Sequence, residues 1–364
     1  MSMKVAISKI GLILLAAVSS NSHAYEAEKI ATGLNIPWGL AYVDPQTILV
    51  TERQGVVKRV NLETGKHQTL FTPKGVWAEG QGGLLDVALS PFDTDLKRKK
   101  VYFTYSKDIE GEGATTLALA TYQNGELSDW QDLFVSTSRS ETGRHFGSRI
   151  AFDDKSLYFS IGDRGVRDNG QDTLTHAGTI LRLMPDGSVP SDNPFVTDKA
   201  VVDEIWSYGH RNPQGLLFDA QSQRLWSIEH GPRGGDEINL IKGGANYGWP
   251  ITSHGKEYWG PLSVGEGELK EGVEPPVKVY VPSIAPGSLA LYRGDKFPEL
   301  KGKLLAGALK LTHINVVTIN DAGKAIAEQR IMSELGERIR DIEVTPKGDI
   351  YFSTDSGNLY RLKR

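Results

Sequence analysis

The chain of 364 residues contains no cysteine, which excludes thiol catalysis, disulfide bonds and zinc sites with cysteine ligands. The motifs HExxH and GxSxG, the phosphate-binding P-loop and the dinucleotide-binding GxGxxG are also absent. These absences disfavour the metalloprotease, esterase, nucleotide-binding and nicotinamide-dependent classes. The general-base candidates that remain are histidines.

Long hydrophobic runs are missing after residue 24, so no later segment predicts a membrane span. Residues 1–24 contain Lys4 and Lys9 near their start, continue with an apolar run and end in the small-x-small sequence SHA. This order predicts a secretory signal peptide that is cleaved after Ala24. A retained anchor is the alternative, but the apolar run is too short to span a bilayer. An exported chain without disulfides needs a large core, and we expect residues 25–364 to form one domain.

The chain also lacks a large excess of charge of either sign. Acidic and basic residues nearly balance, 45 against 41, which gives a formal net charge of −4. Removing the signal peptide, which has two lysines and no acidic residue, makes the mature chain more acidic. No basic cluster offsets this balance, so the charge argues against a nucleic-acid partner.

What the sequence does contain is a recurring unit of short alternating strands separated by Gly, Asp, Asn and Pro turns. Six units recur, at 39–60, 84–106, 148–183, 215–241, 288–319 and 339–362. Each can supply about four strands, the number in one propeller blade. We therefore expect an all-β, six-bladed β-propeller with four-stranded antiparallel blades. A large β-sandwich is the competing architecture.

The spacing of the units is irregular, so several blades must carry long loop insertions. Residues 107–146 and 184–204 are the clearest candidates. Loops of this length in a compact domain are usually functional.

The stretch EHGPRGGDEINLIKGGANYGWP (229–250) is unusually rich in glycine and has one short apolar run. Glycine lets a backbone approach a ligand closely, and calcium prefers oxygen ligands such as carboxylates and carbonyls. The stretch predicts a loop, a strand and a second loop that present backbone oxygens. Two ordinary turns around one strand are the alternative.

His145 lies between Gly143 and Gly147, at the entrance to a predicted strand. In a propeller this is a loop position near the axis, where a base could meet a substrate. A lone histidine is more often structural than catalytic, so the position alone does not establish a base.

Cationic residues form the second set of candidates. Arg211 and Asn212 lie in YGHRNPQG, Lys310 lies in AGALKLTH, and Arg338 and Arg340 lie in LGERIRDIEV. They fall at strand ends or in loops of different units, which can converge on one surface of a propeller. Arginine forks suit carboxylates and phosphates. Solvated surface charge is the alternative interpretation.

Seven motifs occur in a fixed order: GQGGLLDVALSPFD (80–93), GRHFGSRIAF (143–152), SIGDRG (160–165), YGHRNPQGL (208–216), the stretch at 229–250, GALKLTHI (307–314) and GERIRDIEVTPKGDIYFSTD (336–355). As an ordered set they resemble the soluble pyrroloquinoline quinone (PQQ) glucose dehydrogenase family, in its periplasmic aldose sugar dehydrogenase branch. The resemblance covers nearly the whole mature chain. It implies a six-bladed propeller, PQQ, calcium and a periplasmic location.

The resemblance also implies a role for each matching residue. His145 would be the general base, Asp163 would orient it, and Arg211 would stabilise charge on the quinone. The implied cofactor contacts are Gln81, Arg211, Asn212, Tyr258, Lys310, Arg338 and Arg340. The carbonyls of Gly231 and Pro232 would hold the calcium ion on the quinone, and Glu237 and Tyr247 would bind a second, structural calcium ion.

The implied activity is oxidation of the anomeric hydroxyl of an aldose to a lactone, with hydride transfer to the quinone. The loop HGPRGGDE (230–237) and the shorter insertions differ from the glucose-specific branch. They argue against glucose specificity and a tight dimer, so we expect a monomer. The sequence does not identify the electron acceptor. A calcium-dependent propeller lactonase and a non-catalytic binding propeller are the alternatives.

Overall fold

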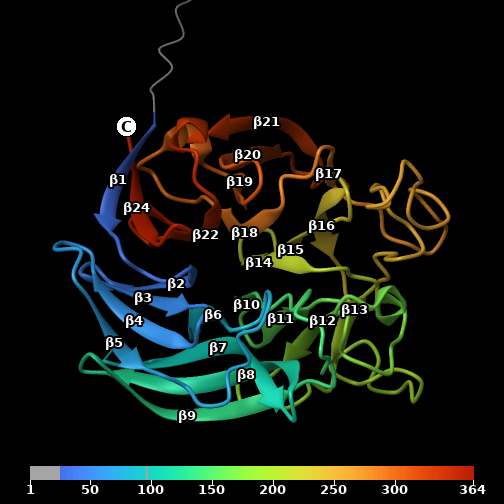
Figure 1. Cartoon of the computed structure of the whole chain (residues 1–364), viewed down its shortest axis with the longest axis horizontal. Coiled ribbons are helices and arrows are strands. Elements are labelled where there is room, and N and C mark those ends of the chain that lie inside the picture. Colours follow the sequence, from blue (N-terminus) through green and yellow to red (C-terminus); the bar gives the residue numbers. More distant parts are fainter. Residues whose placement is uncertain (1–24, 96) are drawn as a thin grey trace, which may run out of the picture.

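Six four-stranded antiparallel sheets stand in a ring in the computed structural model, which describes residues 25–95 and 97–364 (Figure 1). The six-bladed propeller expected from the sequence is therefore confirmed, and the β-sandwich alternative is wrong. The predicted signal peptide at 1–24 lies outside the described residues. In the part of the chain that the structure describes, no helix is long and apolar enough to cross a membrane.

The blades follow the chain order. Blade one contains β2 (Pro37–Asp44), β3 (Thr47–Glu52), β4 (Val56–Asn61) and β5 (His67–Phe71), and blade two contains β6 (Leu84–Leu89), β7 (Arg98–Ile109), β8 (Glu112–Gln123) and β9 (Glu126–Val135). Blade three contains β10 (Ile150–Phe152), β11 (Leu157–Ile161), β12 (Thr179–Leu183) and β13 (Ile205–Tyr208). Blade four contains β14 (Pro213–Asp219), β15 (Arg224–Glu229), β16 (Asp236–Ile241) and β17 (Lys278–Tyr280).

Blade five contains β18 (Pro286–Leu291), β19 (Lys303–Ala308), β20 (Ile314–Ile319) and β21 (Ala325–Ile331). Blade six joins the two ends of the described chain, because β22 (Ile339–Val344), β23 (Ile350–Thr354) and β24 (Asn358–Lys363) are completed by β1 (Glu26–Ala31). Strand β1 pairs antiparallel with β24. This pairing closes the ring with main-chain hydrogen bonds.

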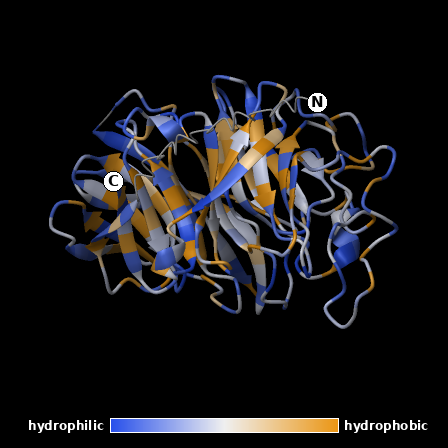
Figure 2. Ribbon diagram, turned by 90° about the horizontal axis from the view of Figure 1, so that it is seen from above, coloured by the Kyte–Doolittle hydropathy of each residue, from blue (hydrophilic) through white to orange (hydrophobic). Residues whose placement is uncertain are grey.

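Six layers of the hydrophobic core are each packed between two neighbouring blades, and a small seventh cluster contains Trp38, Leu85 and Phe146. Because both faces of a blade are covered, its inner strands are apolar and buried along their length. All five residues of β11 are buried, whereas five of the seven residues of the outer strand β21 are exposed. Figure 2 shows the hydrophobic residues concentrated within the strands and the hydrophilic ones in the loops.

The structure corrects one of the two predicted insertions. Residues 107–146 are not an insertion, because they contain the end of β7 and all of β8 and β9. Strands β7 and β8 are 12 residues long, and their length makes this blade appear interrupted in the sequence. Residues 184–204 do form a loop, between β12 and β13. A longer loop at 242–277, between β16 and β17, was not recognised as an insertion.

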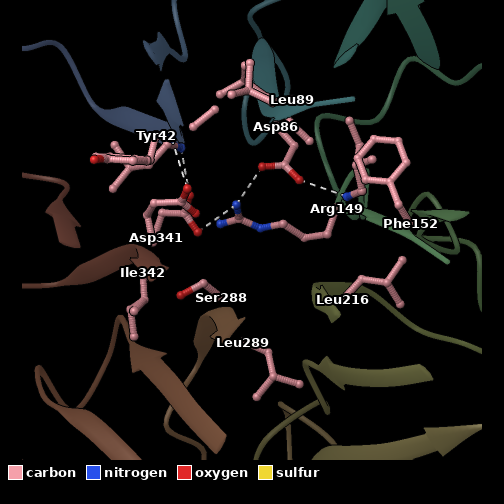
Figure 3. Close-up of a pocket in the computed structure, with 16 residues that line it drawn as sticks. Tyr42, Asp86, Leu89, Arg149, Phe152, Leu216, Ser288, Leu289, Asp341 and Ile342 are labelled. Atoms are coloured by element: carbon pink, nitrogen blue, oxygen red, sulfur yellow. Dashed lines mark hydrogen bonds and ion pairs between the residues drawn. The ribbon is translucent and has the colours of Figure 1, made fainter. Parts of the chain in front are cut away.

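The first strands of the six blades line the propeller axis and contact one another in a closed ring. Arg149 closes the channel between them (Figure 3). Its guanidinium lies 2.9 Å from carboxylate oxygens of both Asp86 and Asp341, and it donates to main-chain carbonyls of blades four, five and six. It also stacks on Trp38, 4.0 Å from the ring centroid.

Arg149 separates two axial cavities. The first axial cavity, of about 200 Å³, is lined by the starts of the innermost strands and the loops before them. The second axial cavity, of about 280 Å³, is lined by later residues of the same strands (Figure 3). On β22, for example, Arg340 lines the first cavity and Glu343 lines the second. Since the six strands run in the same direction, the cavities lie at opposite ends of the axis.

Candidate active site

His145 and Asp163 form a closely coupled pair at the end of the axis that contains the first cavity. Nδ1 of His145 lies 2.5 Å from Oδ1 of Asp163. The Asp163 carboxylate also accepts hydrogen bonds from Nε1 of Trp249, at 2.7 Å, and from the Gly165 amide, at 2.7 Å. Asp163 is 1% exposed. Because a carboxylate accepts, Nδ1 carries the hydrogen and Nε2 of His145 keeps its lone pair for a substrate.

Burial lowers the pKa of His145 below its usual value of 6.5, and Arg211 lowers it further, while Asp163 opposes the shift. The imidazole is therefore neutral at pH 7 and able to accept a proton. Its side chain is 12% exposed, so the free nitrogen is reachable without being fully solvated.

The loop before β10 holds His145 in an unusual conformation. His145 has a φ of 54°, in the left-handed region that few residues other than glycine adopt. Its amide donates a 2.8 Å hydrogen bond to Oε1 of Gln81, from the loop before β6. A Cβ at Gly162 would lie 2.2 Å from the His145 carbonyl oxygen. Gly162, the first glycine of SIGDRG, is therefore required for the close approach of these two loops.

Arg211 lies beside the pair, in the loop between β13 and β14. Its guanidinium donates to the Gly231 carbonyl at 2.8 Å and to the Tyr258 hydroxyl at 3.3 Å, and it lies 5.2 Å from the Trp249 ring centroid. Its buried Nε has no partner among the described residues. One donor of Arg211 is thus left for a ligand.

Four of the predicted cofactor contacts line the first axial cavity: Gln81, Asn212, Arg338 and Arg340. Arg338 and Arg340 converge as expected for an extended run, but both bind one carboxylate. Nε of each arginine lies 2.8 Å from an oxygen of Asp355. Burial favours the neutral acid, yet Arg340 and Arg338 hold the pKa of the Asp355 carboxyl below its usual value.

Arg53 adds a third guanidinium to this cavity, and its buried Nε has no partner in the described part of the chain. Three arginines thus face one carboxylate, which leaves a net positive charge. A ligand with several carboxylates would neutralise it.

A third cavity is much smaller, at about 20 Å³. It is lined by the predicted calcium ligands Gly231, Pro232, Glu237 and Tyr247. That volume suits one water-sized species or ion. Arg211 and the buried carboxylate of Glu229 line the same cavity. The predicted loop–strand–loop at 229–250 is confirmed, with β16 as the strand.

Carboxylates are crowded around this small cavity. Burial, followed by repulsion from Glu229, raises the pKa of Glu237 to about 8. A cation would relieve this repulsion and favour the charged form. Among residues 25–95 and 97–364, no three His, Asp or Glu side chains are arranged to hold a metal ion. Calcium would therefore depend on backbone carbonyls in addition to Glu237.

Two predicted contacts lie apart from the cavities. Lys310 is exposed and does not line the first axial cavity, although its neighbour Leu309 does. Tyr258 is 63% exposed on the 242–277 loop and reaches the site through its hydroxyl contact with Arg211.

Sequence reasoning missed Trp249, Asp355 and Arg53. Trp249 and Asp355 lie within the motifs at 229–250 and 336–355, but only the fold shows that they contact Asp163 and the arginine pair. Arg53, in TERQG, carried no signal beyond its place at a strand end.

Comparison with known proteins places this geometry in a family. Residues 34–361 match the family described as Glucose / Sorbosone dehydrogenase. The chain is 37% identical to aldose sugar dehydrogenase YliI of Escherichia coli, over 92% of each chain. It is 29% identical to quinoprotein glucose dehydrogenase B of Acinetobacter calcoaceticus, over 94% of this chain and 88% of that protein.

Solved structures agree. The apo-form of the soluble aldose sugar dehydrogenase of Escherichia coli superposes with a TM-score of 0.87 at 36% identity, over 93% of this chain and 99% of the other. The PQQ-bound aldose sugar dehydrogenase of Streptomyces coelicolor gives 0.76 at 28% identity, over 93% and 98%. On the match over residues 34–361 and these relatives, the chain belongs to the glucose/sorbosone dehydrogenase family.

Proposed function

We propose that this protein is a PQQ-dependent aldose dehydrogenase that oxidises the anomeric hydroxyl of a sugar to a lactone. The observation that carries the proposal is the placement of the His145–Asp163 pair beside an arginine-rich axial cavity. The PQQ-bound relative supports the cofactor, and the sugar dehydrogenases among the relatives support the substrate class.

The residues of the first axial cavity fit PQQ, a planar quinone with three carboxylates. Arg53, Arg338 and Arg340 would pair with carboxylates, because the unpartnered Nε of Arg53 and the excess of cations over Asp355 leave donors free. Gln81 and Asn212 line the same cavity. The cavity of about 200 Å³ holds a polyatomic ligand, whereas the 20 Å³ cavity does not.

When bound, PQQ would supply the two-electron oxidant, and a calcium ion held by the Gly231 and Pro232 carbonyls would supply Lewis-acid polarisation. His145 takes the proton of the anomeric hydroxyl at Nε2. Asp163 holds the ring and stabilises the imidazolium that forms. Arg211, whose Nε has no partner among the described residues, would stabilise the negative charge that develops on the acceptor. Trp249 fixes Asp163 through its indole N–H.

Calcium at Gly231 requires that the carbonyl be shared, since Arg211 already donates to it. A carbonyl oxygen has two lone pairs, so one hydrogen bond leaves room for a cation. The nearby carboxylates of Glu229 and Glu237 offset the repulsion between Arg211 and calcium. A second, structural calcium ion would bind Glu237 and the Tyr247 carbonyl. Because the cavity of about 20 Å³ has room for one ion, binding of both ions would require it to widen.

The two alternatives explain less of the site. A propeller lactonase would gather several acidic side chains on one metal, and the described residues contain no three His, Asp or Glu side chains placed to hold a metal ion. A non-catalytic binding propeller leaves the His145–Asp163 pair and the free arginine donors without a role. We also propose that the protein is exported to the periplasm through the signal at 1–24 and acts as a monomer.

Reconstitution tests the function directly. Purified apoprotein would be mixed with PQQ and Ca²⁺, and sugar-dependent reduction of a redox dye would be followed with a panel of aldoses. We expect dye reduction that requires both additions and gives a lactone product. Reconstitution without any change in PQQ absorbance, and without dye reduction by any aldose, would contradict the proposal.

A further inference from the structure

The loop between β16 and β17 carries a small β-arm, which we define as residues 255–264. Lys256 pairs with Ser263, and the Glu257 amide donates to the Leu262 carbonyl at 2.8 Å. The tip between these pairs contains Tyr258 and Trp259. In Figure 1 the loop reaches the outer edge of the ring, beside blades three and four.

Three arginines from different loops hold the arm in place. Arg167 forms a bidentate pair with Glu257, at 2.7 and 2.8 Å. Arg233 donates to the Gly260 carbonyl at 2.6 Å, and Arg211 donates to the Tyr258 hydroxyl at 3.3 Å. The position of the tip relative to the active site is therefore set by direct contacts, one of them from Arg211 itself.

The fixed arm presents apolar side chains to solvent. Trp259 is 74% exposed, next to Tyr258 at 63% and near Leu262 at 58%. An exposed indole loses the hydrophobic stabilisation that burial would give it. Clustered exposed apolar side chains on an anchored element are typical of a binding surface.

We propose that Trp259 is a stacking platform for the second sugar ring of a substrate, so that it favours disaccharides and longer reducing sugars over monosaccharides. The proposal rests on the proposed function for the identity of the reacting ring. Trp259 follows the residue whose hydroxyl touches Arg211, so its Cα is within roughly 15 Å of that guanidinium, from one Cα–Cα step and the length of a tyrosine side chain. This limit keeps Trp259 within reach of a sugar ring linked to the one that reacts beside Arg211.

The chemistry of the tip matches a sugar ring. One face of a pyranose presents C–H groups, which pack on the flat, electron-rich face of an indole. A docked redox protein is the other candidate for this surface. The contact between the tip and Arg211 favours the sugar, because a substrate bound beside Arg211 lies next to the arm.

The kinetic test compares Trp259→Ala and Trp259→Phe with wild type in the PQQ-reconstituted protein, with glucose, maltose and maltotriose as substrates. We expect Trp259→Ala to lower kcat/KM for maltose and maltotriose about tenfold, mainly through KM, and to change glucose less than about twofold. Trp259→Phe should retain most of the preference, because a smaller aromatic face remains. Ile326→Ala is the matched control, because Ile326 is an exposed apolar side chain, 63% exposed, on β21 and not on the arm.

Binding to the apoprotein separates this proposal from the function on which it rests. Methyl β-maltoside has a blocked anomeric hydroxyl and cannot be oxidised, so its affinity can be measured by calorimetry without turnover. We expect weaker binding to Trp259→Ala than to wild type. If no aldose is oxidised, the proposed function fails while this difference still supports the platform.

Three results would overturn the platform. Equal losses with glucose and maltose would mean that the arm only positions Arg211. Unchanged kinetics with every sugar would assign the surface to another partner, such as a redox protein. Equal affinity of wild type and Trp259→Ala for methyl β-maltoside would exclude stacking.

Discussion

His145 is made a candidate base by its neighbours rather than by its position in the sequence. Asp163 fixes the hydrogen on Nδ1, Trp249 and Gly165 hold Asp163, and burial keeps the ring neutral. The resemblance of the sequence motifs identifies His145 and Asp163. It does not identify Trp249, because the contact between Trp249 and Asp163 joins segments 86 residues apart.

We expect His145→Ala to lower kcat by roughly 10²–10⁴-fold, the usual loss for a general base, while PQQ binding is retained. Because only the neutral ring accepts a proton, the wild-type rate should fall as the pH drops through a pKa below 6.5. The rate would be measured by dye reduction at saturating PQQ, and PQQ binding by absorbance titration. Added imidazole should restore part of the variant's activity.

Arg338→Ala is the matched control for this prediction. It removes a cation that faces the cavity without touching the base, so it should weaken PQQ binding more than it lowers kcat. A His145→Ala protein that oxidised sugar at nearly the wild-type rate when saturated with PQQ would show that another residue is the base.

Glu237 provides a test of the structural calcium ion that needs no PQQ. A ligand that binds only the folded state stabilises it, by about 2.7 kcal/mol at one hundred times its Kd. We expect Ca²⁺ to raise the Tm of the apoprotein, and Glu237→Gln to reduce that shift because one charged ligand is lost. Glu271→Gln, an exposed carboxylate on the 242–277 loop, is the control. An identical calcium response in wild type and Glu237→Gln would exclude this ligand.

At the scale of elements, the strands were easier to predict than the loops. Each of the six predicted units supplies the inner strands of one blade, because alternation and turn residues record local structure. Residues 107–146 were predicted as an insertion because β7 and β8 are unusually long. No local pattern in the sequence distinguishes a pair of long strands from a pair of short strands joined to a long loop. The sequence pattern did not predict the 242–277 loop as an insertion, although this loop carries Tyr258 and the arm.

Strand β1 gives a prediction at this scale, because it completes blade six by pairing the start of the described chain with its last strand. A chain that begins at residue 32 lacks β1 and leaves the edge of β24 unpaired. We expect a loss of about 3–5 kcal/mol, from several hydrogen bonds of about 1 kcal/mol each, and aggregation through the open edge.

Thermal unfolding and size-exclusion chromatography would compare this shortened chain with one that begins at residue 25. A synthetic peptide with the β1 sequence should restore part of the stability, and a scrambled peptide should not. An unchanged Tm in the shortened chain would show that the pairing of β1 with β24 contributes nothing to closure.

At the scale of the whole molecule, the ring creates environments that no single blade contains. In the second axial cavity Asp86 and Asp341 flank Arg149 (Figure 3), and Glu343 lines the same cavity. Burial, followed by repulsion from Asp341 and Asp86, raises the pKa of Glu343 to about 8, although the Tyr42 amide donates to it.

This shift predicts a pH dependence of stability. The pKa of Glu343 is higher in the folded state than the usual 4.5, so its contribution is complete below that value and is lost as the pH rises through about 8. We expect Glu343 alone to lower the free energy of unfolding by up to about 1.4 kcal/mol per pH unit across this range. Glu343→Gln cannot ionise and should show a flatter profile.

Urea denaturation at four pH values between about 5 and 8 would measure the slope. Glu126→Gln, an exposed residue on β9, serves as the control and should keep the wild-type profile. Parallel profiles for wild type and Glu343→Gln would mean that Glu343 does not titrate with folding in this range.

The sequence by itself determined the six-fold repeat of strands, the family and most of the candidate site, because turn residues, alternation and ordered motifs are local properties of the chain. Only the tertiary structure decided which of the cations are free. Arg338 and Arg340 both bind Asp355, whereas Arg53 keeps an unpartnered donor. Arg149 binds Asp86 and Asp341 across the channel. The pairing of Arg149 depends on which strand ends the closed ring brings together. Its partners Asp86 and Asp341 lie on other blades, so no local pattern in the sequence predicts these contacts.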